Sequence, residues 1–422
     1  MNKNIKLAVA GAVSASASIA NAGIIIPAGD WTLDVSGNVN AYTSWGKTKG
    51  TNTIVGGIGV NAAGAVGNST SNSWGNGLLP NFIGFTGNTR QNDLDVSFTI
   101  SLQPGSAATT ALNGGTGGTG GMSTGNGGIN NRQAFITFGD KSWGSVKIGK
   151  DLGIFASDAI LNDITLLGVG AASAGNINGA ASNTSLGRIG YGYIYADWKP
   201  QIAYTTPNFN GLQATVGISQ AFVTADAATI DILTKSPGSN NAAPAYEGKA
   251  SYSFAANDVT GKVWVSGIAQ KVNAFTVGND DPVSYAGDIG ANVNFAGFGL
   301  TGYYYNGSGI GITGQQMAGY GLNAAGTHAE ARDSEGGYVQ ATYILPTKTK
   351  LAISYGESNL DKSGGDVDGT LIKSNEMWSA GLYHPLTKHV NLVAEYNNQR
   401  SENQQNQRNT ANVGSLGAIL FF

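Results

Sequence analysis

The sequence holds few residues of the kinds that perform acid–base catalysis. It has only three histidines, His328, His384 and His389, and no cysteine. His384 and His389 flank a predicted tight turn, and His328 lies in a predicted long loop. A Ser-His-acid triad or a histidine-rich zinc site needs its side chains to converge, and this spacing gives no basis for convergence. We therefore expect no enzymatic activity and no catalytic residues.

Oxygen ligands for a calcium ion are present in one predicted loop, where Asp361, Asp366 and Asp368 stand beside glycines. Their spacing does not match the EF-hand loop, and a solvated loop is the favoured interpretation. The glycine-rich run 307–311 opens no predicted helix, so it lacks the helix N-terminus that binds phosphate in such motifs. The sequence predicts neither a metal site nor a cofactor.

The segments that must position any functional side chain alternate between apolar and polar residues. Residues 31–41, 93–103, 212–219 and 247–254 all follow this period of two, which is typical of a β-strand with two unlike faces. Each segment has roughly the length that a tilted strand needs to cross a membrane. With 64 glycines, an aromatic content of 9% and 12% charged residues, the composition is that of a curved, all-β protein.

The connections between these segments alternate between short and long. Short connections are predicted near 88–91, 139–143, 207–210, 255–258, 296–298, 346–349 and 385–388. Long connections are predicted near 46–79, 104–130, 151–187, 223–243, 271–282, 308–334, 358–373 and 401–409. They separate about sixteen strands, with short turns at one end and long loops at the other, as membrane barrels arrange them.

The two ends of the chain indicate the compartment. Residues 1–22 resemble a secretory signal peptide, with Lys3 and Lys6, an apolar segment, and a small-residue cleavage site ending at Ala22. At the other end, Leu416, Ala418 and Leu420 share one face of a final strand that ends in Phe422. An ordinary core strand is the alternative for this last segment. We expect domain boundaries of 1–22 for the signal and 23–422 for a single β-barrel.

A sheet can cross a bilayer only when it closes on itself, because hydrocarbon offers no partner for an unpaired backbone amide. A barrel of about sixteen strands is too wide for its side chains to fill and leaves an aqueous channel. The polar faces should line this channel, and aromatic residues at segment ends should form interfacial girdles. The girdle residues that we expect are Trp31, Trp45, Tyr343, Tyr383 and Phe422.

Charged side chains on the predicted inward faces should line the channel. The acids are Asp34, Asp93, Asp95, Glu247, Asp288 and Glu395, and the bases are Lys147, Lys249, Lys262 and Lys350. Because acids outnumber bases in this set, it predicts a slight preference for cations. The whole chain has a formal net charge of −3 and no basic patch, so nucleic acid is not expected as a partner.

Three local motifs resemble those of Gram-negative general porins, in particular the trimeric sixteen-stranded type of proteobacteria. Residues 132–136, followed by 144–150, are similar to the fourth and fifth strands of that family, with Gly149-Lys150 where the family usually has Gly-Arg. Residues 203–209 resemble the turn after its sixth strand. Phe422 resembles the assembly signal that the outer-membrane insertion machinery recognises. The resemblance implies a cell outer-membrane homotrimer, in contact with lipid, that passes ions and small hydrophilic solutes by passive diffusion.

The resemblance also implies that the third long loop, at about 151–187, folds into the barrel and narrows it. In that family, acids on this loop face bases on the wall. The candidates are Asp158 and Asp163, with Asp151 at the root of the loop, and Arg132, Lys147 and Lys150 on the wall. A turn centred near Lys141 would place Arg132 opposite Lys150, and both then lie at the rim unless a bulge turns them inward.

Two other functions are compatible with parts of this pattern. A substrate-specific outer-membrane channel for a sugar, phosphate or small organic solute would share every feature and add an ordered binding track. A secreted β-rich adhesin or surface protein would keep the signal and the alternation. It would have no reason to segregate its loops by length or to end in Phe422.

Overall fold

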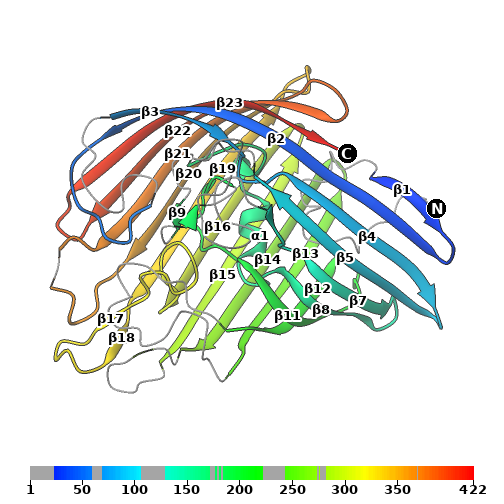
Figure 1. The fold of residues 1–422 in the computed structure, drawn as a ribbon, viewed down its shortest axis with the longest axis horizontal. Coiled ribbons are helices and arrows are strands. Elements are labelled where there is room, and N and C mark those ends of the chain that lie inside the picture. The colour runs from blue at the N-terminus through cyan, green and yellow to red at the C-terminus, as the bar shows by residue number, and fades with distance from the viewer. Residues whose placement is uncertain are drawn as a thin grey trace.

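The computed structural model describes residues 23–58, 69–105, 129–171, 184–221, 243–272, 275, 282–367 and 369–422, and the backbone of 176–177 and 180–181. Sixteen long antiparallel strands form a closed barrel, as predicted (Figure 1). The barrel strands are β2 (Trp31–Lys49), β4 (Phe82–Gln91), β5 (Leu94–Pro104), β7 (Ala134–Asp140), β8 (Gly144–Leu152), β11 (Trp198–Thr205), β12 (Leu212–Ser219), β13 (Ala245–Ala256), β14 (Val259–Lys271), β15 (Val283–Phe295), β16 (Phe298–Ser308), β19 (Asp333–Ile344), β20 (Lys350–Leu360), β21 (Ile372–Pro385), β22 (Val390–Asn403) and β23 (Arg408–Phe421).

Shorter elements extend the wall or lie in the loops. The strands β1 (Ile24–Ala28), β3 (Ser69–Gly75) and β6 (Ile129–Asn130) pair with barrel strands. The loops contain the hairpins β9 (Asn176–Ile177) with β10 (Ala180–Ala181) and β17 (Tyr320–Leu322) with β18 (Ala329–Ala331). They also contain the helix α1 (Ser157–Leu161) and the 3-10 helix η3 (Ile164–Leu167). Within the described residues, no helix is long and apolar enough to cross a membrane.

The barrel closes where the first strand of the ring meets the last. β2 pairs with β23 along twelve positions that include Val39 opposite Leu420. The backbone of Phe422 continues this pairing, since its carbonyl accepts from the Gly37 amide at 2.8 Å and its amide donates to the Gly37 carbonyl at 3.0 Å. The other edge of β2 pairs with β4. The ring therefore has no open edge, which is the condition for crossing hydrocarbon.

The alternation of side chains along the strands gives the barrel an apolar outside and a polar inside. On β22, Leu392 and Tyr396 are exposed on the outer face, whereas Asn397 and Gln399 are buried on the inner face. Several other strands repeat this pattern, with Ile100, Ile136, Ile202, Val265, Ile289, Leu300, Val339, Ile353 and Trp378 all exposed to the outside. The exposed apolar surface is thus a band around the barrel, as a lipid-facing wall requires.

Six of the seven predicted short connections coincide with turns in the structure, and one prediction was displaced. The connection predicted at 88–91 lies instead at Asn92 and Asp93, both with positive φ, because pairing of β4 with β5 continues to Gln91 opposite Leu94. Asp93 is exposed in this turn and does not line the channel, which corrects its predicted position. Residues 1–22 and Asp368 lie outside the described residues.

Candidate channel constriction

The long segment between β8 and β11, residues 153–197, folds into the barrel and is called here the constriction loop. It carries α1 and η3, and Figure 1 shows α1 inside the ring of strands. Phe155, Ala159 and Tyr191 of this loop are fully buried. They belong to a cluster that includes Trp264 of β14 and Tyr338 of β19. The main hydrophobic cluster of the protein therefore lies inside the barrel, between the loop and one side of the wall.

Two buried glutamates on opposite parts of the wall hold the start and the middle of the constriction loop. Glu247 on β13 accepts hydrogen bonds from the Ile154 and Phe155 amides at 2.8 and 2.9 Å. Glu395 on β22 accepts from the Val169 and Gly170 amides, both at 2.8 Å. Both glutamates point inward as predicted, but the loop covers them. They therefore anchor the loop and do not line the water, which corrects their predicted role.

Asp163 is satisfied within the constriction loop and not by the wall cations. Its carboxylate accepts from the Thr165 amide at 2.9 Å, the Arg188 amide at 3.2 Å and the Tyr193 hydroxyl at 2.9 Å. The Arg188 guanidinium lies 3.9 Å away and is itself fully buried. It donates to the Met377 carbonyl at 2.9 Å and to another oxygen of β21. Asp163 and Arg188 together fix the fold of the loop against β21.

Sequence reasoning missed Arg188 because nothing local distinguishes it from a solvated loop residue. The only signal is its position between Gly187 and Gly190, which have φ values of +56° and +76°. Those left-handed conformations favour glycine and turn the chain sharply. Burial lowers the pKa of Arg188 from its ordinary value, with Asp163 acting in the opposite direction.

Asp158 is the one predicted loop acid that faces basic residues of the wall. Lys249 on β13 lies 3.2 Å from one of its carboxylate oxygens, and Lys262 on β14 contacts the other. Lys249 also donates to the Ser157 hydroxyl at 3.0 Å. Burial raises the pKa of Asp158, but the two lysines outweigh burial and hold that pKa below its ordinary value. Lys249 and Lys262 point inward, as the alternation predicted.

Asp151 and Lys147 pair with one another on the wall. They lie four residues apart at the end of β8, and the buried Asp151 carboxylate also accepts from the Gln133 amide at 3.0 Å. The Lys147 ammonium lies 4.8 Å from the centre of the Phe135 ring, a favourable cation–π position. Lys147 faces inward as predicted, whereas Asp151 belongs to the wall at the root of the loop.

Arg132 and Lys150 lie on the side of Asp197, at the end of the constriction loop, and not beside the predicted acids Asp158 and Asp163. The turn between β7 and β8 is placed so that Lys150 pairs with Ala134 and not with Arg132, a shift of two residues from the predicted register. Residues 131–133 form a bulge opposite 101–102, because Ile100 pairs with Ala134 but Gln103 pairs with Asn130. Arg132 lies 6.0 Å from the centre of the Trp198 ring. Lys150 donates to the Asn131 carbonyl at 2.9 Å, close to this bulge.

The remaining predicted channel residues face inward but differ in exposure. Asp95 is exposed near the short turns and pairs with Arg90 at 2.7 Å. Asp288 is buried and accepts from the Tyr303 hydroxyl at 3.1 Å. The carboxylate of Asp34 is half-buried on β2. None of these three acids contacts the constriction loop through a hydrogen bond among the described residues.

Tyr383 was expected in the aromatic girdle at the membrane interface, and this prediction was wrong. Lys350, a predicted channel residue, lies beside it. The Lys350 ammonium lies 5.1 Å from the centre of the Tyr383 ring. Tyr383 is buried inside the barrel against Ile164 and Leu167 of the constriction loop, and its hydroxyl donates to Glu395 at 2.6 Å. Tyr383 therefore supports the loop and does not lie at the membrane interface.

The wall that the loop leaves uncovered carries pairs of hydroxyl groups. Thr86 of β4 and Thr99 of β5 are 3.0 Å apart, and Thr205 of β11 and Thr215 of β12 are also 3.0 Å apart. Ser97 and Thr137 form a third pair between β5 and β7. These six side chains face inward and are half-buried. They give one side of the passage a neutral, hydrogen-bonding surface.

A second long loop also enters the barrel, which sequence reasoning did not predict. Ile310 and Ile312 of the segment 309–319 are fully buried. The Thr313 carbonyl accepts from the Tyr195 amide at 2.8 Å, and the Gln315 amide group donates to the Ala196 carbonyl at 3.1 Å. The segment thus rests on the end of the constriction loop and narrows the passage from the side of the long loops.

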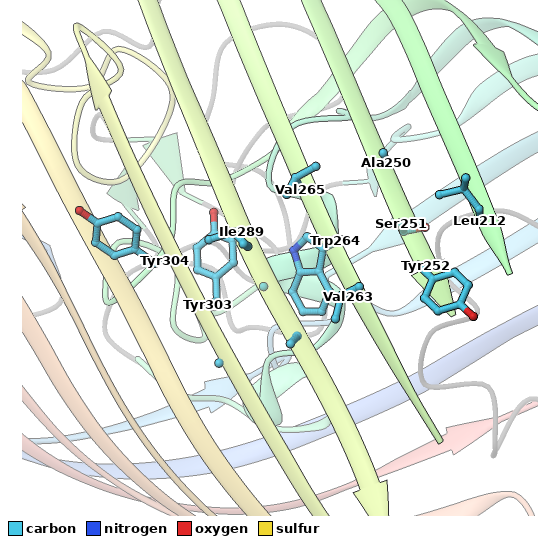
Figure 2. Close-up of a pocket in the computed structure, with 13 residues that line it drawn as sticks. Leu212, Ala250, Ser251, Tyr252, Val263, Trp264, Val265, Ile289, Tyr303 and Tyr304 are labelled. Atoms are coloured by element: carbon cyan, nitrogen blue, oxygen red, sulfur yellow. The ribbon is translucent and has the colours of Figure 1, made fainter. Parts of the chain in front are cut away.

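An apolar groove on the outside of the barrel is separate from this passage. Figure 2 shows it over β12 to β16, lined by side chains such as Leu212, Val263 and Ile289. These three side chains are exposed on the outer face. The groove is therefore part of the lipid-facing surface and not a solute site.

Comparison with known proteins agrees with this geometry. A family model described as Gram-negative porin matches residues 7–404. The structure is similar to the outer membrane channel DcaP of Acinetobacter baumannii, with a TM-score of 0.65 and 15% identity over 93% of this chain and 97% of that one. It is also similar to Salmonella typhi OmpF, with a TM-score of 0.59 and 15% identity over 94% of this chain and all of the other.

Pseudomonas putida OprB is a further similar structure, with a TM-score of 0.52 and 11% identity over 92% of this chain and 94% of that one. A search of curated proteins found no match. The similar structures show the shared barrel, and the family model covers nearly the whole chain. The chain belongs to the Gram-negative porin family.

Proposed function

We propose that this protein is a general diffusion porin, which passes ions and small hydrophilic solutes down their gradients through the barrel. The observation that carries this proposal is the uncovered inner wall, where paired hydroxyl groups and Lys147 stand half-exposed beside an anchored loop. Such a surface suits hydrated solutes of many kinds. The protein resides in the outer membrane, in keeping with its family.

The proposal includes no chemical turnover and no cofactor. Two observations are in keeping with this part. Among the described residues, no group of three or more His, Asp and Glu side chains is arranged to hold a metal ion. His384 and His389 lie at the short turns, where their ring nitrogens bond to Thr349 and to the Phe421 carbonyl.

Liposome swelling with solutes of graded size tests the proposal. Purified protein in vesicles should admit small sugars and amino acids at rates that fall smoothly with their size. A substrate-specific channel is the second candidate, because two loops narrow the passage and could form a binding track. That channel would instead show saturable uptake of one solute and block of its conductance. Swelling rates that depend on one solute alone would overturn the general porin.

The assembly of the protein extends the same proposal. We infer a homotrimer in contact with outer-membrane lipid, since the similar structures include a trimer form of Vibrio cholerae OmpT, with a TM-score of 0.50 at 14% identity. We also infer that residues 1–22 are removed after Ala22, and that Phe422 is the signal for the insertion machinery. Mass spectrometry of the native protein in detergent tests the trimer and the mature start at Gly23 together.

A further inference from the structure

The lysines beside the constriction loop are more exposed than the acids that pair with them. The side chains of Lys147, Lys249 and Lys262 are 27%, 24% and 33% exposed. Those of Asp151 and Asp158 are only 1% and 5% exposed. All three lysines point into the barrel, so their exposed parts meet the water of the passage. The ammonium groups therefore lie between the water and the carboxylates.

Around Asp158 there are two positively charged side chains and one carboxylate. Lys249 and Lys262 both contact this carboxylate, each through a different oxygen. Two ammonium groups against one carboxylate leave one positive charge in excess. At the wall, by contrast, Lys147 has Asp151 to itself. The excess charge is thus localised where α1 approaches β13 and β14.

Neighbouring groups do not remove this excess. Asp288 on β15 lies in register with Ser266 of β14, which in turn lies in register with Lys249. Two strand spacings separate Asp288 from Lys249, about 9 to 10 Å. Asp288 is buried, and no basic group lies within ion-pair distance of it among the described residues. Glu247 is engaged by Lys199 and by the loop amides.

We propose that Lys249 and Lys262 make the constriction favour anions, so that small inorganic and carboxylate anions pass more readily than cations of similar size. The proposal rests on the proposed channel function. In a narrow passage with apolar walls behind it, a fixed charge acts strongly on a passing ion. The half-buried hydroxyl groups on the wall are neutral, including Thr215 in register with Lys249, so they do not offset the lysines.

This preference is the reverse of what the number of inward acids predicts. Of those acids, Glu247, Asp288 and Glu395 are buried, and Asp93 lies in a turn. These four acids are therefore not in contact with the water at the constriction. Of the other two, Asp95 is paired with Arg90, and Asp34 lies on β2 in register with Thr86. A count by strand face gives every inward charge the same weight, whereas the constriction loop covers Glu247 and Glu395 and leaves Lys249 and Lys262 in contact with water.

Reversal potentials across planar bilayers in a gradient of potassium chloride test the proposal. The native protein should pass chloride more readily than potassium. Lys249→Gln and Lys262→Gln, made separately, should each lower the chloride-to-potassium permeability ratio by about twofold or more, as expected for one charge near the ion path. Asp158→Asn should raise the ratio, because it removes the partner of both lysines.

Lys388→Gln is the matched control. Lys388 carries the same charge but lies in the short turn between β21 and β22, so the ratio should stay within experimental error of the native value. A conducting native protein that prefers potassium would overturn this inference while leaving the channel intact. Unchanged ratios in both lysine variants would overturn it as well. A native protein without conductance would instead overturn the channel function on which the inference rests.

Discussion

Glu395 shows how a single buried carboxylate can hold the loop that enters the barrel. It accepts hydrogen bonds from the Val169 and Gly170 amides of the constriction loop, both at 2.8 Å. The Tyr383 hydroxyl on β21 also donates to it. Hydrogen bonds to an ionised acceptor each contribute roughly 1.5 to 3 kcal/mol. The position of the loop therefore depends on the charge of this residue as well as on apolar packing.

Glu395→Gln removes that charge while keeping the size of the side chain. We expect the middle of the loop to move more freely, because a neutral amide oxygen binds the two backbone amides less strongly. Single-channel recordings should show larger current fluctuations and more frequent substates. Asp95→Asn, at an exposed acid near the short turns, should leave the current as quiet as in the native protein. Equal noise in both variants would contradict the anchoring role.

Acid pH should act on the channel through Asp158. Lys249 and Lys262 lower the pKa of Asp158 below its ordinary value of 3.8. At pH values above 3.8 the carboxylate is therefore charged, and the contacts that this charge stabilises are present. These contacts are lost only as the pH falls through the lower pKa of the folded protein. Anion preference should stay constant from pH 7 to 5 and rise below about pH 3.8. In Asp158→Asn the rise should be smaller, and an equal rise in both proteins would exclude Asp158 as its source.

At the scale of elements, the strands were predicted well and the inward loops were predicted poorly. Strands with one lipid-facing and one water-facing side leave a period of two in the sequence, so β5, β12 and β13 were recognised from alternation alone. The constriction loop was located only by its likeness to a family. The entry of the segment 309–319 was missed, because a glycine-rich loop buried inside a barrel has the same composition as one in solvent.

Side chains covered by a loop were also placed wrongly for a physical reason. Tyr383 stands at the end of a strand, where an aromatic ring suits the membrane interface, yet it packs against the constriction loop. The predicted roles of Glu247 and Glu395 failed in the same way. Alternation identifies the inner face of a strand, but it does not tell which part of that face another segment will cover.

The meeting point of the inward loops offers a test at this scale. Gly190 has a φ of +76°, and a Cβ there would lie 2.5 Å from Ile58 and 2.7 Å from Thr313. Gly190→Ala therefore adds a clash between three loops to the strain of a left-handed residue, and we expect a loss of about 2 kcal/mol or more in the free energy of unfolding. Urea unfolding followed by tryptophan fluorescence measures it.

Gly326→Ala provides the matched control for that variant. Gly326 also has a positive φ, +67°, but a Cβ there meets no atom within 4 Å. Only the backbone strain remains, so the loss should be about 1 kcal/mol. Should the two variants be equally stable, the close contact of the three loops at Gly190 would be refuted.

At the scale of the whole molecule, closure of the ring is the feature on which transport depends. β2 pairs with β23 and with β4 on its two edges, and Phe422 completes the seam by its backbone bonds to Gly37. A closed ring of this size leaves room for water even with two loops inside. Position in the membrane and passage of solutes both depend on this single arrangement.

The last residue gives a prediction about assembly as distinct from folding. In Phe422→Ser the backbone bonds to Gly37 are kept, so the protein refolded in detergent should remain a barrel by circular dichroism and by its heat-dependent mobility on gels. Its amount in the outer membrane of cells should fall severalfold, because the proposed signal is lost. Normal insertion of this variant would remove Phe422 as the assembly signal.

The central claim is that the closed barrel holds a continuous, water-filled passage. Conductance of the purified native protein in planar bilayers tests it most directly. The account predicts discrete upward steps of current whose size grows in proportion to the concentration of potassium chloride. Absence of such steps from protein that is shown to be inserted and folded would contradict the account.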